Sequence, residues 1–191
     1  SEFTLPSEFR NKLFQFQSAA VKIAAHYLEK RKGVVIGDVV GLGKTLMATA
    51  LARIFEENHG VSTLIICPKN LMEMWQSYVD QYGLRGKVMS SSVVINEIQD
   101  VPARFRLVLI DESHNFRNRE GKRYRAIKEF IDQSDSHCIL LSATPYNKSY
   151  LDLSAQLRFF VSEDKDLGIR PEHLLREMGE AEFSRYQVLP N

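Results

Sequence analysis

Five consecutive residues combine glycine, lysine and threonine in a pattern that could bind phosphate: Gly41-Leu42-Gly43-Lys44-Thr45. They stand between an apolar run and a segment with helical spacing, so backbone N–H groups and the helix N-terminus can surround a phosphate. The ammonium of Lys44 would then reach the terminal phosphates, and the hydroxyl of Thr45 would ligate Mg²⁺. The alternative is a glycine-rich turn with a helix-capping threonine. The strand before it and the helix after it favour nucleoside triphosphate binding.

The first position of this loop departs from the full phosphate-loop pattern. That pattern starts with a glycine five residues before the second loop glycine. The chain has Asp38 at this position. The segment therefore fits the shorter pattern GxGKT better than the complete one.

Two adjacent carboxylates, Asp111 and Glu112, follow a second apolar run, Leu107 to Ile110. Parallel α/β sheets bind ligands at the carboxyl ends of their strands, which is where this pair is expected. We expect Asp111 to hold Mg²⁺ through its water shell and Glu112 to orient or deprotonate the attacking water. The tetrapeptide from Asp111 to His114 is also typical of a surface turn, and a lone histidine is usually structural. The combination of this tetrapeptide with a phosphate loop favours a catalytic site.

The spacing of apolar residues predicts the helices that position these groups. Helical patterns run from Ser7 to about Lys32, Thr45 to about Asn58, Leu71 to Tyr82 and Tyr124 to Ile131. The apolar residues of the first pattern are Leu13, Phe16, Ala20, Ile23, Ala24 and Tyr27.

Short apolar runs predict the strands. They are Val34 to Ile36, expected to be a buried central strand, then Thr63 to Cys67, Leu107 to Ile110 and Cys138 to Leu141, with a weaker run at Val93 to Ile95. Since helices separate most of these runs, the chain is predicted to be α/β, with a parallel sheet sandwiched between helices.

Length and composition favour one α/β domain, because 191 residues with 44% hydrophobic and 26% charged residues are too few for two domains of ordinary size. Three parts are expected along the chain. Residues 1–6 are a tag or linker remnant, since Ser1-Glu2-Phe3 could come from cloning. Residues 7–160 are the ATP-binding domain, and residues 161–191 are a partial helical extension leading to a missing second domain.

Charge and cysteine content limit the partners and the compartment. Cys67 and Cys138 each lie in an apolar run, which is typical of buried reduced thiols and indicates a reducing intracellular setting. No apolar stretch reaches the ~18 residues of a membrane span, so no membrane association is expected. The net charge of +1 gives no global argument for nucleic acid, which must rest on local patches.

One local basic cluster follows the acidic pair. Five basic residues occur within nine positions: Arg117, Arg119, Lys122, Arg123 and Arg125. They could contact phosphates of a nucleic-acid backbone without reading bases, which predicts sequence-independent, salt-sensitive binding. A solvated loop and helix face, balanced by Glu120 and Glu129, is the equal alternative.

Taken in chain order, these motifs resemble the first motor domain of superfamily-two helicases over about residues 10 to 160. Within that superfamily the chain resembles the Swi/Snf-type DNA translocases, whose loop often reads DEMGLGKT and whose acidic box often reads DEAHRIKN. Here the loop reads DVVGLGKT and the box DESHNFRN. The segment from Cys67 to Leu71, with Trp75, resembles the CPxSLxxxW box of the family, although a lone tryptophan on a helix is usually core.

The resemblance implies a P-loop NTPase of RecA-like fold, with a Walker A loop and a DEAH-type box. It implies that Gln17, by itself expected to be a solvated helix residue, reads adenine while Phe16 packs beside it. It implies that Ser142 and Thr144 couple the nucleotide site to the DNA groove, with His114 as the relay. It implies that Lys69 and Asn70 contact the DNA backbone, in addition to the candidates Arg117 and Arg119 of the basic cluster.

Two positions depart from the family pattern. Phe14 stands where the family usually has a basic residue, and Ser142-Ala143-Thr144 stands where these translocases commonly have TGT. A serine-alanine-threonine box by itself is a common hydroxyl-rich turn. In this resemblance it fits the wider superfamily and bacterial members better than remodellers of chromatin.

The sequence therefore supports one leading hypothesis and one alternative. The first is an ATP- and Mg²⁺-binding motor domain of a double-stranded DNA translocase that needs a second RecA-like domain for efficient hydrolysis. It would act in the bacterial cytoplasm and be nucleoid-associated when on DNA. The alternative is an ATP-dependent switch or recruitment module within a larger bacterial restriction, repair or defence protein.

Overall fold

The computed structural model describes residues 3–10, 15–37, 43–116, 118–142 and 150–161. The described helices are α1 (Ser7–Arg10), α2 (Gln15–Arg31), α3 (Lys44–His59), α4 (Met72–Tyr82), α5 (Val94–Glu97), α6 (Lys122–Ser134) and α7 (Tyr150–Leu157). The strands are β1 (Gly33–Gly37), β2 (Thr63–Cys67), β3 (Gly86–Ser90), β4 (Leu107–Ile110) and β5 (His137–Ser142). Short 3₁₀ turns occur at η1 (Lys69–Leu71), η2 (Ile98–Asp100) and η3 (Ser113–Phe116).

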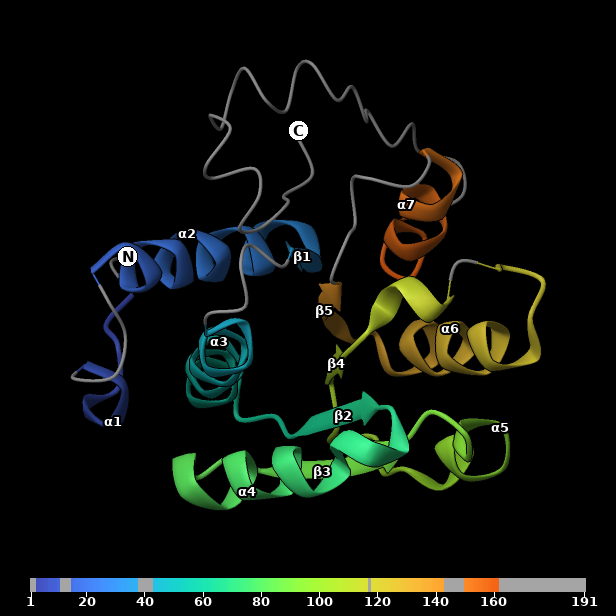
Figure 1. The fold of residues 1–191 in the computed structure, drawn as a ribbon, viewed down its shortest axis with the longest axis horizontal. Helices are drawn as coiled ribbons and strands as arrows, with labels where there is room; N and C mark the ends of the chain where they lie inside the picture. The colour runs from blue at the N-terminus through green and yellow to red at the C-terminus, as the bar shows by residue number, and fades with distance from the viewer. Residues whose placement is uncertain (1–2, 11–14, 38–42, 117, 143–149, 162–191) are drawn as a thin grey trace.

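The described strands form one sheet in the order β1-β5-β4-β2-β3, and all its pairings are parallel. Helices cover both faces, with α2, α3 and α4 on one side and α5, α6 and α7 on the other (Figure 1). The predicted α/β class, with a parallel sheet sandwiched between helices, is therefore confirmed.

Each strand supplies side chains to two separate apolar cores, because successive residues of a strand point to opposite faces. In β4, Leu107 and Leu109 belong to the core beneath α2, α3 and α4. Val108 and Ile110 belong to the core beneath α5, α6 and α7. All four residues are fully buried, which explains why the strand appears in the sequence as a continuous apolar run.

Strand β1 lies at one end of the described sheet, so its predicted central position was wrong. Its five residues are nevertheless all buried. Val34 and Ile36 pack in the core that contains α2, and a Cβ atom placed on Gly33 would come within 2.4 Å of the Phe160 ring. Helix α2 and this ring hide the strand, which gives an end strand the apolar sequence expected of a central one.

The weak strand predicted at Val93 to Ile95 was also wrong, since this segment begins helix α5. Val94 and Ile98 are buried while Ile95 is 43% exposed, which is a helical pattern of burial. The strand that the sequence did not predict is β3, which lies just before α5. Because β3 is a partly exposed end strand whose second residue is Lys87, it lacks the apolar run that identified the other strands.

The long helix predicted from Ser7 to Lys32 is represented by α1 and α2, and residues 11–14 between them, including Leu13, lie outside the description. Of the residues expected on its apolar side, Ile23 is 38% exposed. Val21 and Leu28 are buried instead, so the buried face lies slightly around the helix from the predicted one. Leu5, within the segment predicted to be a tag or linker remnant, is also buried.

Both cysteines are buried free thiols, as predicted. Burial, together with the nearby Asp111 carboxylate, raises the pKa of the Cys67 thiol to about 12. Burial also raises the pKa of Cys138. Both groups therefore remain protonated thiols near neutral pH.

Candidate functional site

Four sequence motifs meet at one edge of the sheet, because parallel strands all end there. Gly37 at the end of β1 is paired with Ser142 at the end of β5, and Ile110 at the end of β4 is paired with Ile66 in β2. The phosphate loop follows β1, the acidic box follows β4, and η1 follows β2. Strands β1 and β4, which precede the loop and the box in the sequence, therefore lie on either side of β5.

The described part of the phosphate loop begins at Gly43, and Gly41 and Leu42 lie outside the described residues. Gly43 has a φ of 85°, in the left-handed region that favours glycine. The N–H of Met47 donates to the carbonyl of Gly43 at 2.8 Å, which closes the first turn of α3. Lys44 and Thr45 are the first residues of this helix, and the leading N–H groups of a helix point toward its N-terminal end. This arrangement suits an anion.

Gln17 lies against the loop and is 3% exposed, so it is not the solvated helix residue that periodicity alone predicts. A Cβ atom placed on Gly43 would be 2.2 Å from its side-chain nitrogen Nε2. The amide of Gln17 is thus next to the start of α3. Phe16 precedes it in α2, but its side chain lies outside the description.

Replacing Gly43 by alanine is expected to weaken nucleotide binding at least about tenfold, or about 1.4 kcal/mol. The methyl group would displace Gln17 Nε2, and the left-handed φ would cost about 1–2 kcal/mol. Gly60→Ala is the matched control, because Gly60 has a φ of 65° at the other end of α3 with nothing within 4 Å of the added Cβ. Calorimetric titration with ATP tests this. Equal affinities in the two variants would contradict it.

The carboxylate of Asp111 is 3% exposed and accepts a hydrogen bond at each oxygen. The N–H of Glu112 donates to Oδ1 at 2.8 Å, and Nε1–H of Trp75 donates to Oδ2 at 2.9 Å. Glu112 itself has a φ of 56°. Since a non-glycine residue seldom adopts this conformation, the box begins with a sharp, strained turn of the kind that clusters at functional sites.

A chain of polar contacts joins the acidic box to the end of β5. His114 Nε2 lies 3.0 Å from Glu112 Oε2, and His114 Nδ1 lies 3.3 Å from the hydroxyl oxygen of Ser142. If Nε2–H donates to Glu112, Nδ1 can accept from Ser142. The contact between His114 and Ser142 has the geometry that the predicted relay needs, whereas Thr144 lies outside the described residues.

Sequence reasoning missed two buried side chains that hold the box from the other face of the sheet. The hydroxyl of Ser113 donates to Gln156 Oε1 at 2.7 Å and lies 3.2 Å from the carbonyl oxygen of Leu141. Ser113 and Gln156 are 0% and 1% exposed. Helix α7 is therefore tied to the box through Gln156. The serine in place of the alanine of DEAH was the available signal, because a buried hydroxyl needs a partner.

The candidate nucleic-acid residues occupy two turns at the same edge. Lys69 and Asn70 are exposed on η1 after β2. Arg119 follows η3 after the neighbouring strand β4 and is partly buried, and Arg117 lies outside the described residues. Both turns follow the carboxyl ends of paired strands, β2 and β4.

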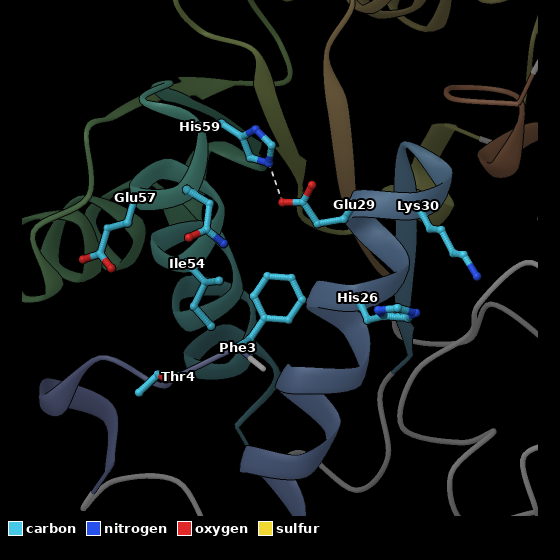
Figure 2. Close-up of a pocket in the computed structure, with 9 residues that line it drawn as sticks. Phe3, Thr4, His26, Glu29, Lys30, Ile54, Glu57 and His59 are labelled. Atoms are coloured by element: carbon cyan, nitrogen blue, oxygen red, sulfur yellow. Dashed lines mark hydrogen bonds and ion pairs between the residues drawn. The ribbon is translucent and has the colours of Figure 1, made fainter. Parts of the chain in front are cut away.

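A separate cavity of about 750 Å³ lies at the other end of α3, between Phe3, Thr4, α2 and α3 (Figure 2). The carboxylate of Glu29 in α2 contacts the ring nitrogen Nε2 of His59 in α3 across it. Its other charged residues, Lys30 and Glu57, have opposite signs. We interpret this cavity as a gap in the packing of α2 against α3 and not as part of the candidate site, since the described site residues are at the opposite end of α3.

The parallel sheet and the helices on its two faces form a RecA-like α/β fold. Residues 16–97 match the sequence model of the SNF2-related domain. The chain is also similar to the SWI2/SNF2 ATPase core of Sulfolobus solfataricus in complex with dsDNA, with a TM-score of 0.69 and 19% identity over 84% of this chain and 38% of that one. Residues 16–97 are thus similar to the SNF2-related domain, and the described residues share the fold of a SWI2/SNF2 ATPase core.

Curated proteins are similar to the chain as well. The CHD3-type chromatin-remodeling factor CHR7 of Arabidopsis thaliana is 24% identical over 86% of this chain and 16% of its own length. The DNA annealing helicase and endonuclease ZRANB3 of Mus musculus is 26% identical over 74% of this chain and 15% of its own length. The chain therefore spans less than a fifth of each of these relatives. Both are eukaryotic, so the predicted bacterial source stays a prediction.

None of the described helices combines the length and the apolar character that crossing a bilayer requires.

Proposed function

We propose that the chain is the ATP-binding motor domain of a DNA-dependent ATPase that translocates on double-stranded DNA. The observation that carries this proposal is the meeting, at one edge of a RecA-like sheet, of a helix starting at Gly43-Lys44 and the carboxylates of Asp111 and Glu112. The SNF2-related match over residues 16–97 supports it independently.

In this proposal the nucleotide lies across the start of α3. The backbone of Gly41, Leu42 and Gly43 surrounds the phosphates, and Lys44 contacts the β- and γ-phosphates. Gln17 hydrogen-bonds adenine, and Phe16 packs beside the base. The burial of Gln17 beside Gly43 supports its role, because its amide lies next to the start of α3, where the nucleotide would bind.

Thr45 and Asp111 would hold Mg²⁺, which polarises the phosphates when bound. No group of three or more His, Cys, Asp or Glu side chains suited to a metal occurs among the described residues. A magnesium ion that keeps several waters and binds nucleotide phosphates needs only one or two protein carboxylates, so the donor set fits. Glu112 would orient or deprotonate the attacking water, and its contact with His114 would hold the Glu112 side chain in place.

Contact with DNA would occur at the turns that follow β2 and β4. Lys69, Asn70, Arg117 and Arg119 would bind backbone phosphates, and the Ser142–His114 contact, together with Thr144, would couple this surface to the nucleotide site. Such contacts read no bases, so binding should be sequence-independent and weaken steeply with salt. The similarity to an ATPase core solved with dsDNA supports DNA as the partner.

Efficient hydrolysis would need a second RecA-like domain of the same polypeptide that supplies an arginine to the transition state. Residues 7–160 would form the first domain and residues 161–191 would lead toward the second. A bacterial cytoplasmic protein, nucleoid-associated when on DNA, remains part of the proposal.

The decisive experiment compares this chain with the longer polypeptide that contains it. The chain should bind Mg·ATP with a dissociation constant in the range of roughly 1 μM to 1 mM and turn it over very slowly. The longer polypeptide should hydrolyse ATP faster when double-stranded DNA is added. Absence of ATP binding would refute the motor function, and strong DNA-stimulated turnover by the chain alone would refute the need for a second domain. ATP binding without DNA stimulation in the longer polypeptide would favour the switch module.

A further inference from the structure

Trp75 makes a contact that the sequence does not suggest. Its ring is completely buried in the first turn of α4, within the core beneath α2, α3 and α4. Its Nε1–H donates to Asp111 Oδ2 at 2.9 Å, across 36 positions of sequence. A buried indole N–H needs an acceptor, but a neutral carbonyl would satisfy it without the cost of removing a carboxylate from water.

This hydrogen bond and its partner fix the orientation of the Asp111 carboxylate. Glu112 N–H holds Oδ1 at 2.8 Å, and the indole holds Oδ2. Two donors on different oxygens leave little freedom for the plane of the carboxylate to rotate. Each oxygen can accept more than one hydrogen bond, so both remain able to bind a hydrated cation.

The packing of α4 makes the indole a rigid support. Trp75 lies beside the ring of Tyr78, at a centroid distance of 6.1 Å, and Val79 is buried on the same helix. Helix α4 continues directly from η1, where the N–H of Met72 donates to the carbonyl of Lys69. The indole therefore connects the exposed turn after β2 to the acidic box after β4.

We propose that Trp75 is a positioning residue, which through its indole N–H holds the Asp111 carboxylate in the orientation that binds hydrated Mg²⁺ with the nucleotide. This rests on the proposed function of Asp111. Trp75 would then have two roles: its ring stabilises the core, and its N–H orients the Asp111 carboxylate. Outer partners that orient a metal-binding group commonly change metal affinity about 10- to 100-fold when they are removed.

Trp75→Phe separates these two roles, because phenylalanine keeps an aromatic ring in the core and lacks the N–H donor. Tyr78→Phe is the matched control on the same helix, since it removes a polar atom without touching Asp111. Binding of an N-methylanthraniloyl ATP analogue is measured as Mg²⁺ is varied. In Trp75→Phe the Mg²⁺ concentration for half-maximal binding should rise about 10- to 100-fold. Binding in the presence of EDTA should not change.

Trp75 is the only tryptophan of the sequence, so the contact can be observed without nucleotide. The single indole ¹H–¹⁵N resonance of the unchanged chain should move upfield and exchange faster with solvent in Asp111→Ala. An unmoved resonance would overturn the contact. A Trp75→Phe variant that is less stable but has the unchanged chain's Mg²⁺ half-saturation would overturn the positioning role. Nucleotide binding that does not depend on Mg²⁺ in the unchanged chain would overturn the proposed role of Asp111 as well.

Discussion

Replacing Lys44 by alanine is expected to weaken ATP binding by about 2–5 kcal/mol, which is roughly 30-fold to several-thousand-fold. Lys44 is the first residue of α3, directly after Gly43. Its ammonium would be the main positive charge opposite the terminal phosphates, where closing of the site removes water. Backbone N–H groups at the helix start would remain, but they carry only partial charges. The fold should be unaffected, since alanine is a good residue for a helix.

Lys87→Ala is the control for this prediction, because Lys87 is an exposed lysine on the end strand β3. Titration calorimetry with ATP and Mg²⁺ should give an unchanged affinity for Lys87→Ala and no measurable heat for Lys44→Ala at the same concentrations. Thermal unfolding of the variants should occur within a few degrees of the unchanged chain. Binding by Lys44→Ala at the original affinity would show that the nucleotide does not lie at the start of α3.

Most of the architecture could be predicted because buried parallel strands leave a strong signal. Strands β2 and β4 agree with their predicted bounds residue by residue, and both are continuous apolar runs. The alternation of strands and helices also predicts that the phosphate loop after β1 and the acidic box after β4 lie at the same edge of the sheet. The sequence signal was misleading for α5 and weak for β3. The segment of α5 is rich in β-branched residues but is helical, and β3 is partly exposed at the end of the sheet, so it lacks a continuous apolar run.

The contacts that support the site could not be predicted from periodicity. Gln17 with Gly43, Trp75 with Asp111, and Ser113 with Gln156 are pairs that join different elements. A helical pattern shows which face is buried but not which polar atom meets another across the core. Hydrogen bonding of buried groups predicts only that some partner exists. The positions of Gly41, Leu42, Arg117 and Thr144 stay predictions, as do the roles assigned to all the site residues.

The sharp turn at Glu112 links fold and chemistry in a way that a mutation can test. Its φ of 56° has an energetic cost that glycine would avoid, yet the chain has a carboxylate there. The turn points Glu112 toward His114, which in turn contacts Ser142 at the end of β5. If the side chain served only the fold, a neutral residue of the same shape would be equivalent. If it handles the attacking water, the charge is required.

Glu112→Gln is therefore expected to lower the ATP turnover number about 10²- to 10⁴-fold, the usual contribution of a general base, while ATP affinity changes little. Glutamine keeps the length of the side chain and an oxygen that can still contact His114. Turnover is measured in the longer polypeptide with double-stranded DNA, and affinity in this chain. Glu73→Gln, an exposed change on α4, controls for the loss of one charge. A Glu112→Gln enzyme with full turnover would assign the water to another residue, whereas loss of ATP binding would give Glu112 a role in holding the nucleotide.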